Sequence, residues 1–230
     1  IAKSEDNQKK LVANVSHDFR SPLTSIKGFL EAMQDGTIPT ELYPKYIGIV
    51  LNETDRLIKL TNSLLTLNNL NTKGMILEKT DFDINQVIRN TVTAFEPACI
   101  EKKIAVELIL TSDVMTVNAD MGKIQQVLYN LLDNAIKFSP NSSIIKIETY
   151  EKHNKIFVSV KDKGIGIPKE NLKQIWGRFY KTDLSRGKDK KGTGLGLSIA
   201  KEIIQSHNEN INVTSTVNGG TEFTFSLPKA

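Results

Sequence analysis

The chain is short of cysteine and of long apolar runs. Cys99 is the single cysteine among 230 residues, which excludes disulfides and thiolate metal clusters and fits a reducing compartment. No apolar stretch approaches the roughly 18–20 residues needed to cross a bilayer, and no signal peptide is visible. Because the chain begins at Ile1 rather than Met, we read it as a fragment of a longer protein, which leaves any membrane anchor to the absent region.

Concentrated charge of one sign is also scarce. The 30 basic and 26 acidic residues give a net charge of +4 and are spread along the whole length. The run 188–191 is too short for a nucleic-acid reader, which gathers positive charge on one face. Neither the dinucleotide fingerprint G-x-G-x-x-G nor the phosphate loop G-x-x-x-x-G-K-[ST] is present. We therefore expect no nucleic-acid partner.

Helical periodicity dominates the first part of the chain. A helix over 5–33 carries apolar residues at steps of three and four, and Gly and Pro break the pattern at 35–40. A second periodic stretch follows, with its apolar stripe at Tyr46, Val50, Leu57, Leu60, Leu64 and Leu67. Two such helices cannot cover their own apolar face, so we predict a homodimer through residues 5–71 that closes a four-helix bundle.

The remainder of the chain alternates strand and helix patterns. The expected strands are 76–82, 104–110, 115–118, 143–151, 155–162, 210–216 and 221–227, and the expected helices are 85–102, 122–138 and 195–206. This mixture predicts an α/β sandwich, in which helices cover one face of a mainly antiparallel sheet. His153 in a turn and His207 at a helix end are interpreted as structural residues.

His17 is the main candidate for chemistry in the helical part. It falls two residues past Val15, so it lies off the apolar stripe and points outward, with Asp18 beside it. Histidine changes charge near neutral pH and serves as acid, base or nucleophile. A lone histidine is usually structural, and these residues taken alone leave both interpretations open.

Two blocks in the second part have the residue types of a nucleotide site. Asn130, Asn134 and Lys137 share one helix face, where they offer amide oxygens for a hard cation and a positive charge for phosphate. Asp162 follows a strand and can accept from an exocyclic amine, while Gly164 and Gly166 let a flat ring approach the backbone. Each block has an ordinary alternative, which is a polar helix surface for the first and a glycine turn for the second.

Two further blocks lie downstream. Gly192, Gly194 and Gly196 lead into a helix, where backbone N–H groups face an anion. Before them, the segment 176–181 is followed by a polar, basic stretch to Lys191, which we interpret as a mobile lid. Arg178, Lys181 and Arg186 in this region can reach phosphate, although a solvated surface is the default for each.

Taken in order and spacing, these blocks resemble the sensor histidine kinases of two-component signalling, over nearly the whole chain. The surroundings of His17 resemble the phosphoacceptor box, and the four downstream segments resemble the N box (130–139), the first glycine box (162–166), the F box (176–181) and the second glycine box (192–196). The resemblance implies an α+β fold, with a helical hairpin in 1–72 that forms a dimeric four-helix bundle. A Bergerat (GHKL) α/β sandwich that binds ATP would follow in 73–230.

The resemblance also implies a function. His17 would take a phosphoryl group from ATP and pass it to an aspartate in the receiver domain of a response regulator, with Asp18 as base or orienter. Ser21 stands where the family often has Thr or Asn, and it would serve a phosphatase step on that partner. Asn130 would bind Mg²⁺. The implied nucleotide contacts are Asn130, Asn134, Lys137, Asp162, Gly164, Gly166, Arg178, Phe179, Tyr180, Lys181, Gly192, Thr193, Gly194, Leu195 and Gly196.

Two rival functions remain at this point. Chaperone and mismatch-repair ATPases share the fold and would hydrolyse ATP without forming a phosphoprotein, but they have no use for the pair His17-Asp18. A silent scaffold would have no need of the intact nucleotide residues. The resemblance further implies a cytoplasmic part of a membrane-anchored bacterial sensor. One departure is Trp176-Gly177, where many members have Phe and an acid.

Overall fold

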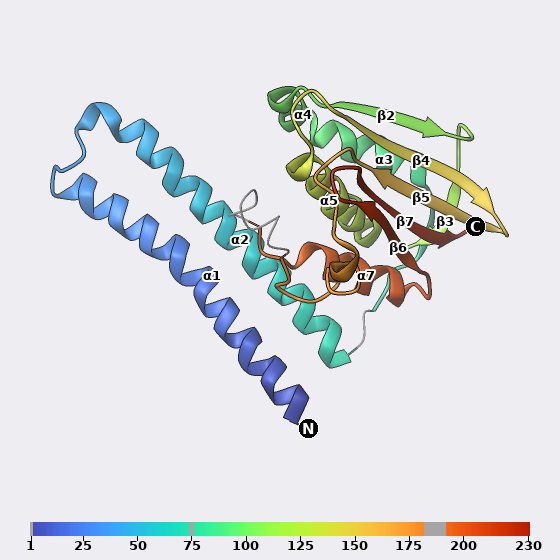
Figure 1. The fold of residues 1–230 in the computed structure, drawn as a ribbon, viewed down its shortest axis with the longest axis horizontal. Coiled ribbons are helices and arrows are strands. Elements are labelled where there is room, and N and C mark those ends of the chain that lie inside the picture. Colours follow the sequence, from blue (N-terminus) through green and yellow to red (C-terminus); the bar gives the residue numbers. More distant parts are fainter. Residues whose placement is uncertain (1, 74–75, 182–191) are drawn as a thin grey trace. The chain divides into compact units, whose positions relative to one another are not determined.

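The computed structural model describes residues 2–73, 76–181 and 192–230 (Figure 1). The predicted lid over 182–191 lies outside these described residues. The chain divides into two compact units, residues 1–68 and 69–230, and each is described by itself. Within the described ranges, neither long helix has the apolar length that a bilayer crossing requires.

The first unit is a helical hairpin. The helices α1 (Ala2–Gln34) and α2 (Tyr43–Lys73) are joined by a turn that includes the short 3-10 helix η1 (Thr40–Leu42). Gly36 has a φ of +79°, a conformation that glycine adopts without the cost a side chain imposes, and the Asp35 carboxylate accepts from the Thr37 N–H at 2.9 Å. The predicted hairpin is therefore confirmed.

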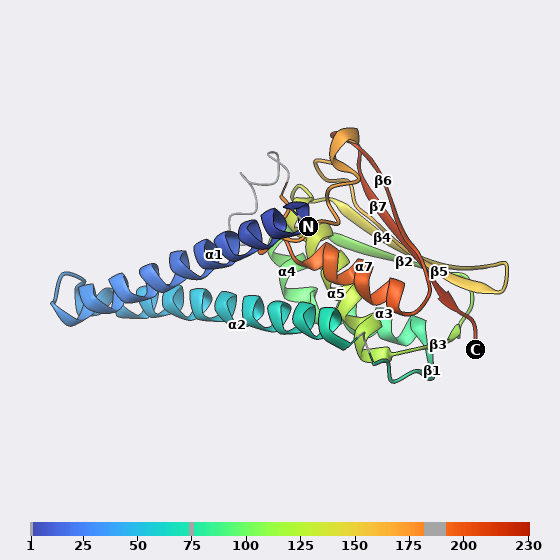
Figure 2. The ribbon, with the colours of Figure 1, turned by 90° about the horizontal axis from the view of Figure 1, so that it is seen from below.

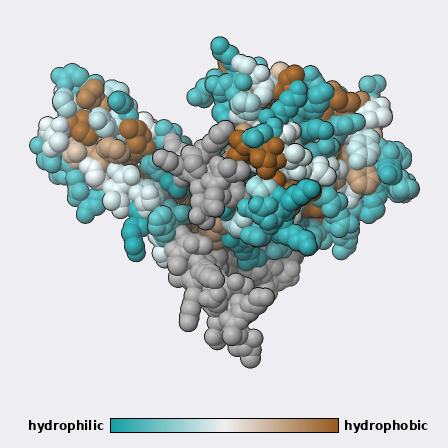
Figure 3. All heavy atoms as spheres, in the orientation of Figure 1, coloured by the Kyte–Doolittle hydropathy of each residue, from teal (hydrophilic) through white to brown (hydrophobic). Residues whose placement is uncertain are grey.

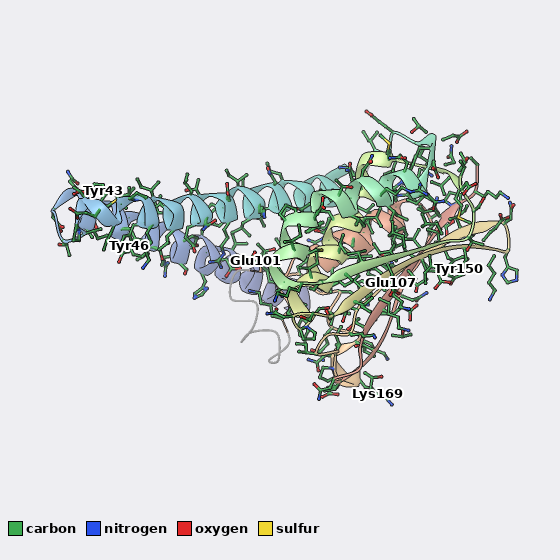
Figure 4. All side chains as sticks on the ribbon, turned by 90° about the horizontal axis from the view of Figure 1, so that it is seen from above. Tyr43, Tyr46, Glu101, Glu107, Tyr150 and Lys169 are labelled. Carbon is green, nitrogen blue, oxygen red and sulfur yellow. The ribbon has the colours of Figure 1, made fainter. Side chains whose placement is uncertain are left out.

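Aromatic contacts hold the two helices together near the turn. The Phe29 and Tyr46 rings lie 5.2 Å apart, and the Tyr43 hydroxyl donates to the Met33 carbonyl at 2.6 Å. Figure 4 labels both tyrosines at this end of the hairpin. Farther along α2, Leu60 is only 1% exposed. Of the apolar stripe expected from the sequence, Tyr46 thus packs against α1 and Leu60 is buried.

A second apolar stripe on α2 has no cover within the hairpin. Its members recur at steps of four and seven and are between 45% and 59% exposed: Ile47, Leu51, Ile58 and Leu65. Leu23 and Leu30 of α1 are also about half exposed and lie seven residues apart. Apolar side chains are visible on the surface of this unit in Figure 3. Heptad spacing on both helices is the pattern by which helices pack against further helices.

The second unit is an α/β sandwich. Its elements are β1 (Thr80–Asp83), α3 (Ile84–Ala94), α4 (Glu96–Lys102), β2 (Ala105–Leu110), β3 (Thr116–Ala119), α5 (Met121–Phe138), β4 (Ile144–Lys152), β5 (Lys155–Lys161), η2 (Lys169–Asn171), α7 (Gly196–Ser206), β6 (Ile211–Thr216) and β7 (Gly220–Pro228). The main sheet has the order β2-β4-β5-β7-β6, and only β2 and β4 run parallel. Helices α3, α5 and α7 cover one face (Figure 2). The predicted sandwich is confirmed.

The two faces of this sheet alternate in character along each strand. The helix-covered face supplies the core, with Ile145, Ile147, Val158, Val160, Phe223 and Phe225 each no more than 5% exposed. On the opposite face, the Tyr150 and Phe157 rings stack at 5.3 Å as a cross-strand pair. Tyr150 is labelled on the sheet in Figure 4.

Three predicted elements need correction. The strand predicted at 76–82 begins only at Thr80, and it pairs with β3 in a separate two-stranded sheet, so β3 also lies outside the main sheet. The single helix predicted over 85–102 is wrong, because α3 ends at Ala94 and α4 begins at Glu96. Pro97 accounts for this break, since proline has no backbone N–H and is tolerated only in the first turn of a helix.

His207 ties the end of α7 to the start of α5. Its Nδ1 donates to the Ile203 carbonyl at 2.8 Å, and its Nε2 accepts from the Asp120 backbone N–H at 3.0 Å. Asp120 in turn caps α5 by accepting from the Lys123 N–H at 3.0 Å. Burial lowers the pKa of His207, and the two bonds use both nitrogens of the neutral ring. The structural interpretation of this histidine therefore fits.

Candidate functional site

Asp162 is buried at the point where β5 ends. Its side chain is 6% exposed, and its Oδ1 accepts from the Gly164 N–H at 2.7 Å and from the Thr221 N–H at 3.2 Å. Burial raises the pKa of the Asp162 carboxyl, and these two hydrogen bonds offset part of that rise. A buried carboxylate with one oxygen engaged is a specific acceptor for a ligand donor at the other oxygen.

Gly164 and Gly166 allow three segments to meet backbone to backbone. A Cβ at Gly164 would lie 2.7 Å from the Phe138 carbonyl oxygen, at the end of α5. Gly166 has a φ of +68°, and a Cβ there would overlap the Thr216 carbonyl oxygen at the end of β6. The Asn218 N–H donates to the Ile165 carbonyl at 2.8 Å. The glycines thus set the loop after Asp162 against α5 and the β6–β7 hairpin.

The polar face of α5 lies beside the start of α7. A Cβ at Gly196 would come within 3.4 Å of the Asn130 amide oxygen, so the first residue of α7 packs against that side chain. The Asn130 Nδ2 is buried without a hydrogen-bond partner among the described residues. Farther along α5, Lys137 forms an ion pair with Asp133 at 2.7 Å. Amide groups, a cation and a helix N-terminus together suit phosphate and its metal ion.

Phe179 of the F-box segment contacts Gly194 of the second glycine block. The Phe179 N–H donates to the Gly194 carbonyl at 2.9 Å, and Gly194 has a φ of +68°. A Cβ at Gly194 would lie 2.9 Å from the Phe179 Cα, so only glycine fits there. Thr193 accepts from the Leu195 N–H at 3.4 Å. Of this block, Gly192 is the first described residue after the gap.

The F-box segment is fixed by polar contacts on both sides. Arg178 forms an ion pair with Glu202 of α7 at 3.4 Å, and the Tyr180 hydroxyl accepts from the Asn171 amide at 2.8 Å. Lys181 is half-buried and ends the described part of this segment.

Trp176, the departure from the family pattern, has a structural role. Its ring meets Phe223 of β7 edge-on at 5.8 Å between centroids, and the Lys201 ammonium lies 5.8 Å from the same ring. The indole thus packs the F box against the sheet and α7. At Gly177 a Cβ would lie 3.1 Å from the Gln174 carbonyl oxygen, so this turn favours a residue without a side chain.

His17 belongs to the other unit, on α1. Its side chain is 82% exposed, and its Nδ1 lies 3.5 Å from the Asp18 carboxylate, which is itself only 21% exposed. Ser21, one helical turn farther along, is exposed. The outward position expected for His17 is therefore found. A shallow, open stretch of surface on the same helix is formed by Ser16, Phe19, Arg20, Leu23, Thr24 and Lys27.

Sequence reasoning missed two contributors to the Asp162 site. Thr221 supplies one of the backbone donors to the carboxylate, and Gly220 lets the chain come so close that a Cβ there would overlap the Asp162 carbonyl oxygen. The adjacent glycines 219–220 signalled only a hairpin turn. Thr221, which follows these glycines, is visible in the sequence, but its contact with Asp162 depends on how β7 is aligned with β5. Asp133, the ion-pair partner of Lys137, was also missed.

Comparisons with known proteins match both units. The model of the His Kinase A (phospho-acceptor) domain matches residues 7–73, and the model of the histidine kinase-, DNA gyrase B- and HSP90-like ATPases matches residues 119–230. The sensor histidine kinase WalK of Bacillus subtilis (strain 168) is 37% identical over 231 residues, which cover 98% of this chain and 37% of that protein. The chain therefore spans little more than a third of the length of this curated relative.

Solved structures of histidine kinases are similar as well. The catalytic domain of histidine kinase ThkA is 35% identical, with a TM-score of 0.59 over 66% of this chain and 96% of that one. Histidine kinase ThkA in complex with the response regulator protein TrrA is 31% identical, with a TM-score of 0.79 over 100% of this chain and 64% of that one. Two family models over successive stretches, with relatives matched along the whole chain, mean that this chain belongs to the sensor histidine kinases.

Proposed function

We propose that this chain catalyses the ATP-dependent phosphorylation of His17 and then transfers the phosphoryl group to an aspartate of a response regulator. The observation that carries the proposal is the coexistence of two sites in one chain. One is an exposed histidine whose Nδ1 faces the Asp18 carboxylate at 3.5 Å, and the other is a buried carboxylate, Asp162, framed by glycines. A nucleotide hydrolase has no use for the first, and a scaffold has no use for the second.

The chemistry follows from the tautomer of His17. With the Asp18 carboxylate beside Nδ1, the proton is favoured there, which leaves the Nε2 lone pair directed to solvent. That lone pair forms the N–P bond to the γ-phosphorus while the bond from phosphorus to the β–γ bridging oxygen breaks and ADP leaves. Asp18 stabilises the positive charge that develops on the ring.

The nucleotide would lie between α5, the loop after Asp162 and the start of α7. Asp162 Oδ2 would accept from the adenine amine, Asn134 and Lys137 would contact phosphates, and the glycines of 192–196 would present backbone N–H groups. The remaining contacts are proposed in the same region: Gly164, Gly166, Arg178, Phe179, Tyr180, Lys181, Thr193 and Leu195.

Asn130 fits the proposed magnesium site. Its amide supplies an oxygen, the donor type that Mg²⁺ prefers, and its buried Nδ2 is not committed to any described partner. The packing of Gly196 against this amide puts it at the helix start where phosphate is favoured. When bound, Mg²⁺ neutralises phosphate charge.

We propose a homodimer through residues 5–71, within a dimerisation and phosphotransfer domain of residues 1–72 that is followed by the ATP-binding domain, 73–230. The support is the uncovered stripe on α2, whose members Leu51, Ile58 and Leu65 are more than half exposed at heptad spacing. Full burial of an exposed side chain of this kind contributes about 1.5–3 kcal/mol, so burying the exposed half of each contributes about 1 kcal/mol, and a two-fold axis doubles each contribution. A second copy would therefore bury the stripe in a four-helix bundle.

The proposed partner is the receiver domain of a response regulator. ThkA, which is 31% identical, is known in complex with the response regulator protein TrrA. The open helix surface next to His17 supports such docking, because it combines the apolar Phe19 and Leu23 with the charge of Arg20. A cationic, partly apolar surface suits the acidic phosphorylation site of a receiver. Ser21 keeps a hydroxyl for a phosphatase step on the same partner.

The chain would be the cytoplasmic part of a membrane-anchored bacterial sensor. The sensor histidine kinase WalK, which matches 98% of this chain, is a longer protein. The signal would be received by a region outside this chain.

Labelling with γ-³²P-ATP tests the function. We expect wild type to gain a label that is acid-labile and alkali-stable, the signature of phosphohistidine. His17→Ala should lose it while keeping nucleotide affinity, because the nucleotide residues lie in the other unit. His153→Ala, at an exposed histidine in the β4–β5 turn, is the matched control and should label normally. Undiminished labelling of His17→Ala would overturn the assignment, and steady hydrolysis without label would favour an ATPase.

A further inference from the structure

The two oxygens of Asp162 have different commitments. Oδ1 accepts from two backbone N–H groups, those of Gly164 and Thr221. Within the described part of the chain, Oδ2 has no donor. Any group that fixes Thr221 therefore also fixes the direction in which Oδ2 points.

Thr221 is held directly against Asp162. The Asp162 N–H donates to the Thr221 carbonyl at 2.8 Å, and the Thr221 N–H returns a bond to Oδ1 at 3.2 Å. Thr221 is 7% exposed, and alternation along β7 puts it on the helix-covered face with Phe223. Its side chain thus shares one face of the sheet with the carboxylate.

Ser215 of β6 is the hub of the polar contacts behind this pair. Its Oγ accepts from the Ile167 N–H at 2.8 Å, donates to the Gly220 carbonyl at 2.8 Å and lies 2.9 Å from the Thr221 Oγ1. A hydroxyl has one proton and two lone pairs. Because the Ser215 proton goes to Gly220, the Thr221 hydroxyl must be the donor in the third contact. Thr221 is then left with lone pairs only.

We propose that Ser215 is a positioning residue that sets the base specificity of the nucleotide site. Because the Ser215 Oγ accepts the hydrogen bond from the Thr221 hydroxyl, Thr221 has no proton left to offer a ligand. Asp162 Oδ2 and the Thr221 hydroxyl oxygen are then both acceptors. A pair of acceptors matches a purine with an exocyclic amine at position 6, as in adenine, and disfavours a 6-oxo purine such as hypoxanthine. This inference rests on the proposed function, since it specifies which base the Asp162 site accepts.

Removal of Ser215 would change the polarity of the site rather than only its rigidity. In Ser215→Ala the Thr221 hydroxyl loses its acceptor, so its proton becomes available to a base carbonyl. One new hydrogen bond to an oxo group, in place of a repulsion between lone pairs, corresponds to about a tenfold change in relative affinity. The ratio of affinities for ADP and IDP should therefore fall about tenfold.

Titrations of the full chain with ADP and with IDP provide the test. Ser215→Thr keeps the hydroxyl and should retain the wild-type ratio, and Thr214→Ala, at an exposed neighbour on the same strand, should also retain it. The double variant Ser215→Ala/Thr221→Val lacks the Thr221 hydroxyl, so it has no donor for the base carbonyl. It should therefore lose the gain in relative affinity for IDP. A return of the ADP-to-IDP affinity ratio to the wild-type value would show that the Thr221 hydroxyl donor, and not a change in the fold, causes the effect.

Four outcomes would overturn the inference. Equal weakening of ADP and IDP binding in Ser215→Ala would mean that Ser215 only supports the fold, and a gain for IDP that persists in the double variant would exclude the Thr221 proton. If wild type binds ADP and Ser215→Ala keeps the wild-type ratio, only the role of Ser215 fails. If wild type binds neither nucleotide, both the role of Ser215 and the proposed function fail.

Discussion

Replacing Asp162 by Asn separates nucleotide recognition from folding. Asn keeps an oxygen at the Oδ1 position, where it still accepts from the Gly164 and Thr221 N–H groups at 2.7 and 3.2 Å. The flipped amide is excluded, because it would set an NH₂ group against two N–H donors. The amide nitrogen must therefore occupy the Oδ2 position and face the amine of the base, donor against donor.

The substitution should weaken nucleotide binding without lowering the stability of the fold. A hydrogen bond to a charged group contributes about 1.5–3 kcal/mol, so the dissociation constant for ADP should rise about 10- to 100-fold. The free energy of unfolding should stay within about 1 kcal/mol of wild type or rise, since Oδ1 keeps its bonds and the buried charge is gone. Asp162→Ala is the contrasting variant, because it leaves two backbone donors unpaired and should destabilise the fold by about 1–3 kcal/mol for each.

Titration with a fluorescent ADP analogue and urea unfolding measure the two quantities on the same samples. We expect Asp162→Asn to bind weakly and unfold normally, and Asp162→Ala to fail in both. Wild-type affinity in Asp162→Asn would refute the reasoning, because the carboxylate could then not be the acceptor for the base. A large loss of stability in Asp162→Asn would show instead that the negative charge itself is needed for folding.

Two further predictions concern assembly and pH. Leu51→Ser combined with Ile58→Ser should convert the dimer to a monomer in sedimentation equilibrium at micromolar concentration, while Asn52→Ala should not; a wild-type monomer there would contradict the proposed interface. Because burial lowers the pKa of His207, the folded chain takes up this proton at lower pH than the unfolded chain, so stability is present above about pH 6.5 and is lost as pH falls below it. Urea unfolding at successive pH values should show a smaller loss for His207→Gln than for wild type, whereas the exposed-site control His153→Gln should match wild type; equal slopes in all three would rule out His207 as the cause.

The spacing of apolar residues and the positions of glycine and proline predicted much of this fold, because both are local properties of the sequence. The apolar spacing of the first helix, the glycine after Asp162 and the hairpin turn at 218–220 all indicate structure within a few residues. The split of the helix after Ala94 was missed although Pro97 is visible in the sequence, because the apolar pattern continues across it.

The parts that the sequence could not predict depend on register between distant segments. Ser215 and Thr221 meet because β6 pairs with β7 in one register, and Thr221 meets Asp162 because β7 pairs with β5. A slip of one residue would turn each side chain to the other face of the sheet. The exposed stripe of α2 was missed for a different reason. The helix has two apolar faces, and the periodicity of its sequence indicates only the stronger of the two.

The close approaches at Gly164, Gly166 and Gly220 have a consequence for drug resistance. Main-chain atoms of three segments touch there, so the frame around Asp162 is held by backbone that side-chain replacements alter little. If Asp162 accepts from adenine, as proposed above, a compound that copies the adenine ring would bind against this frame and the carboxylate. Escape mutations would then be confined to few positions, and those at the glycines would damage the enzyme along with the inhibitor site.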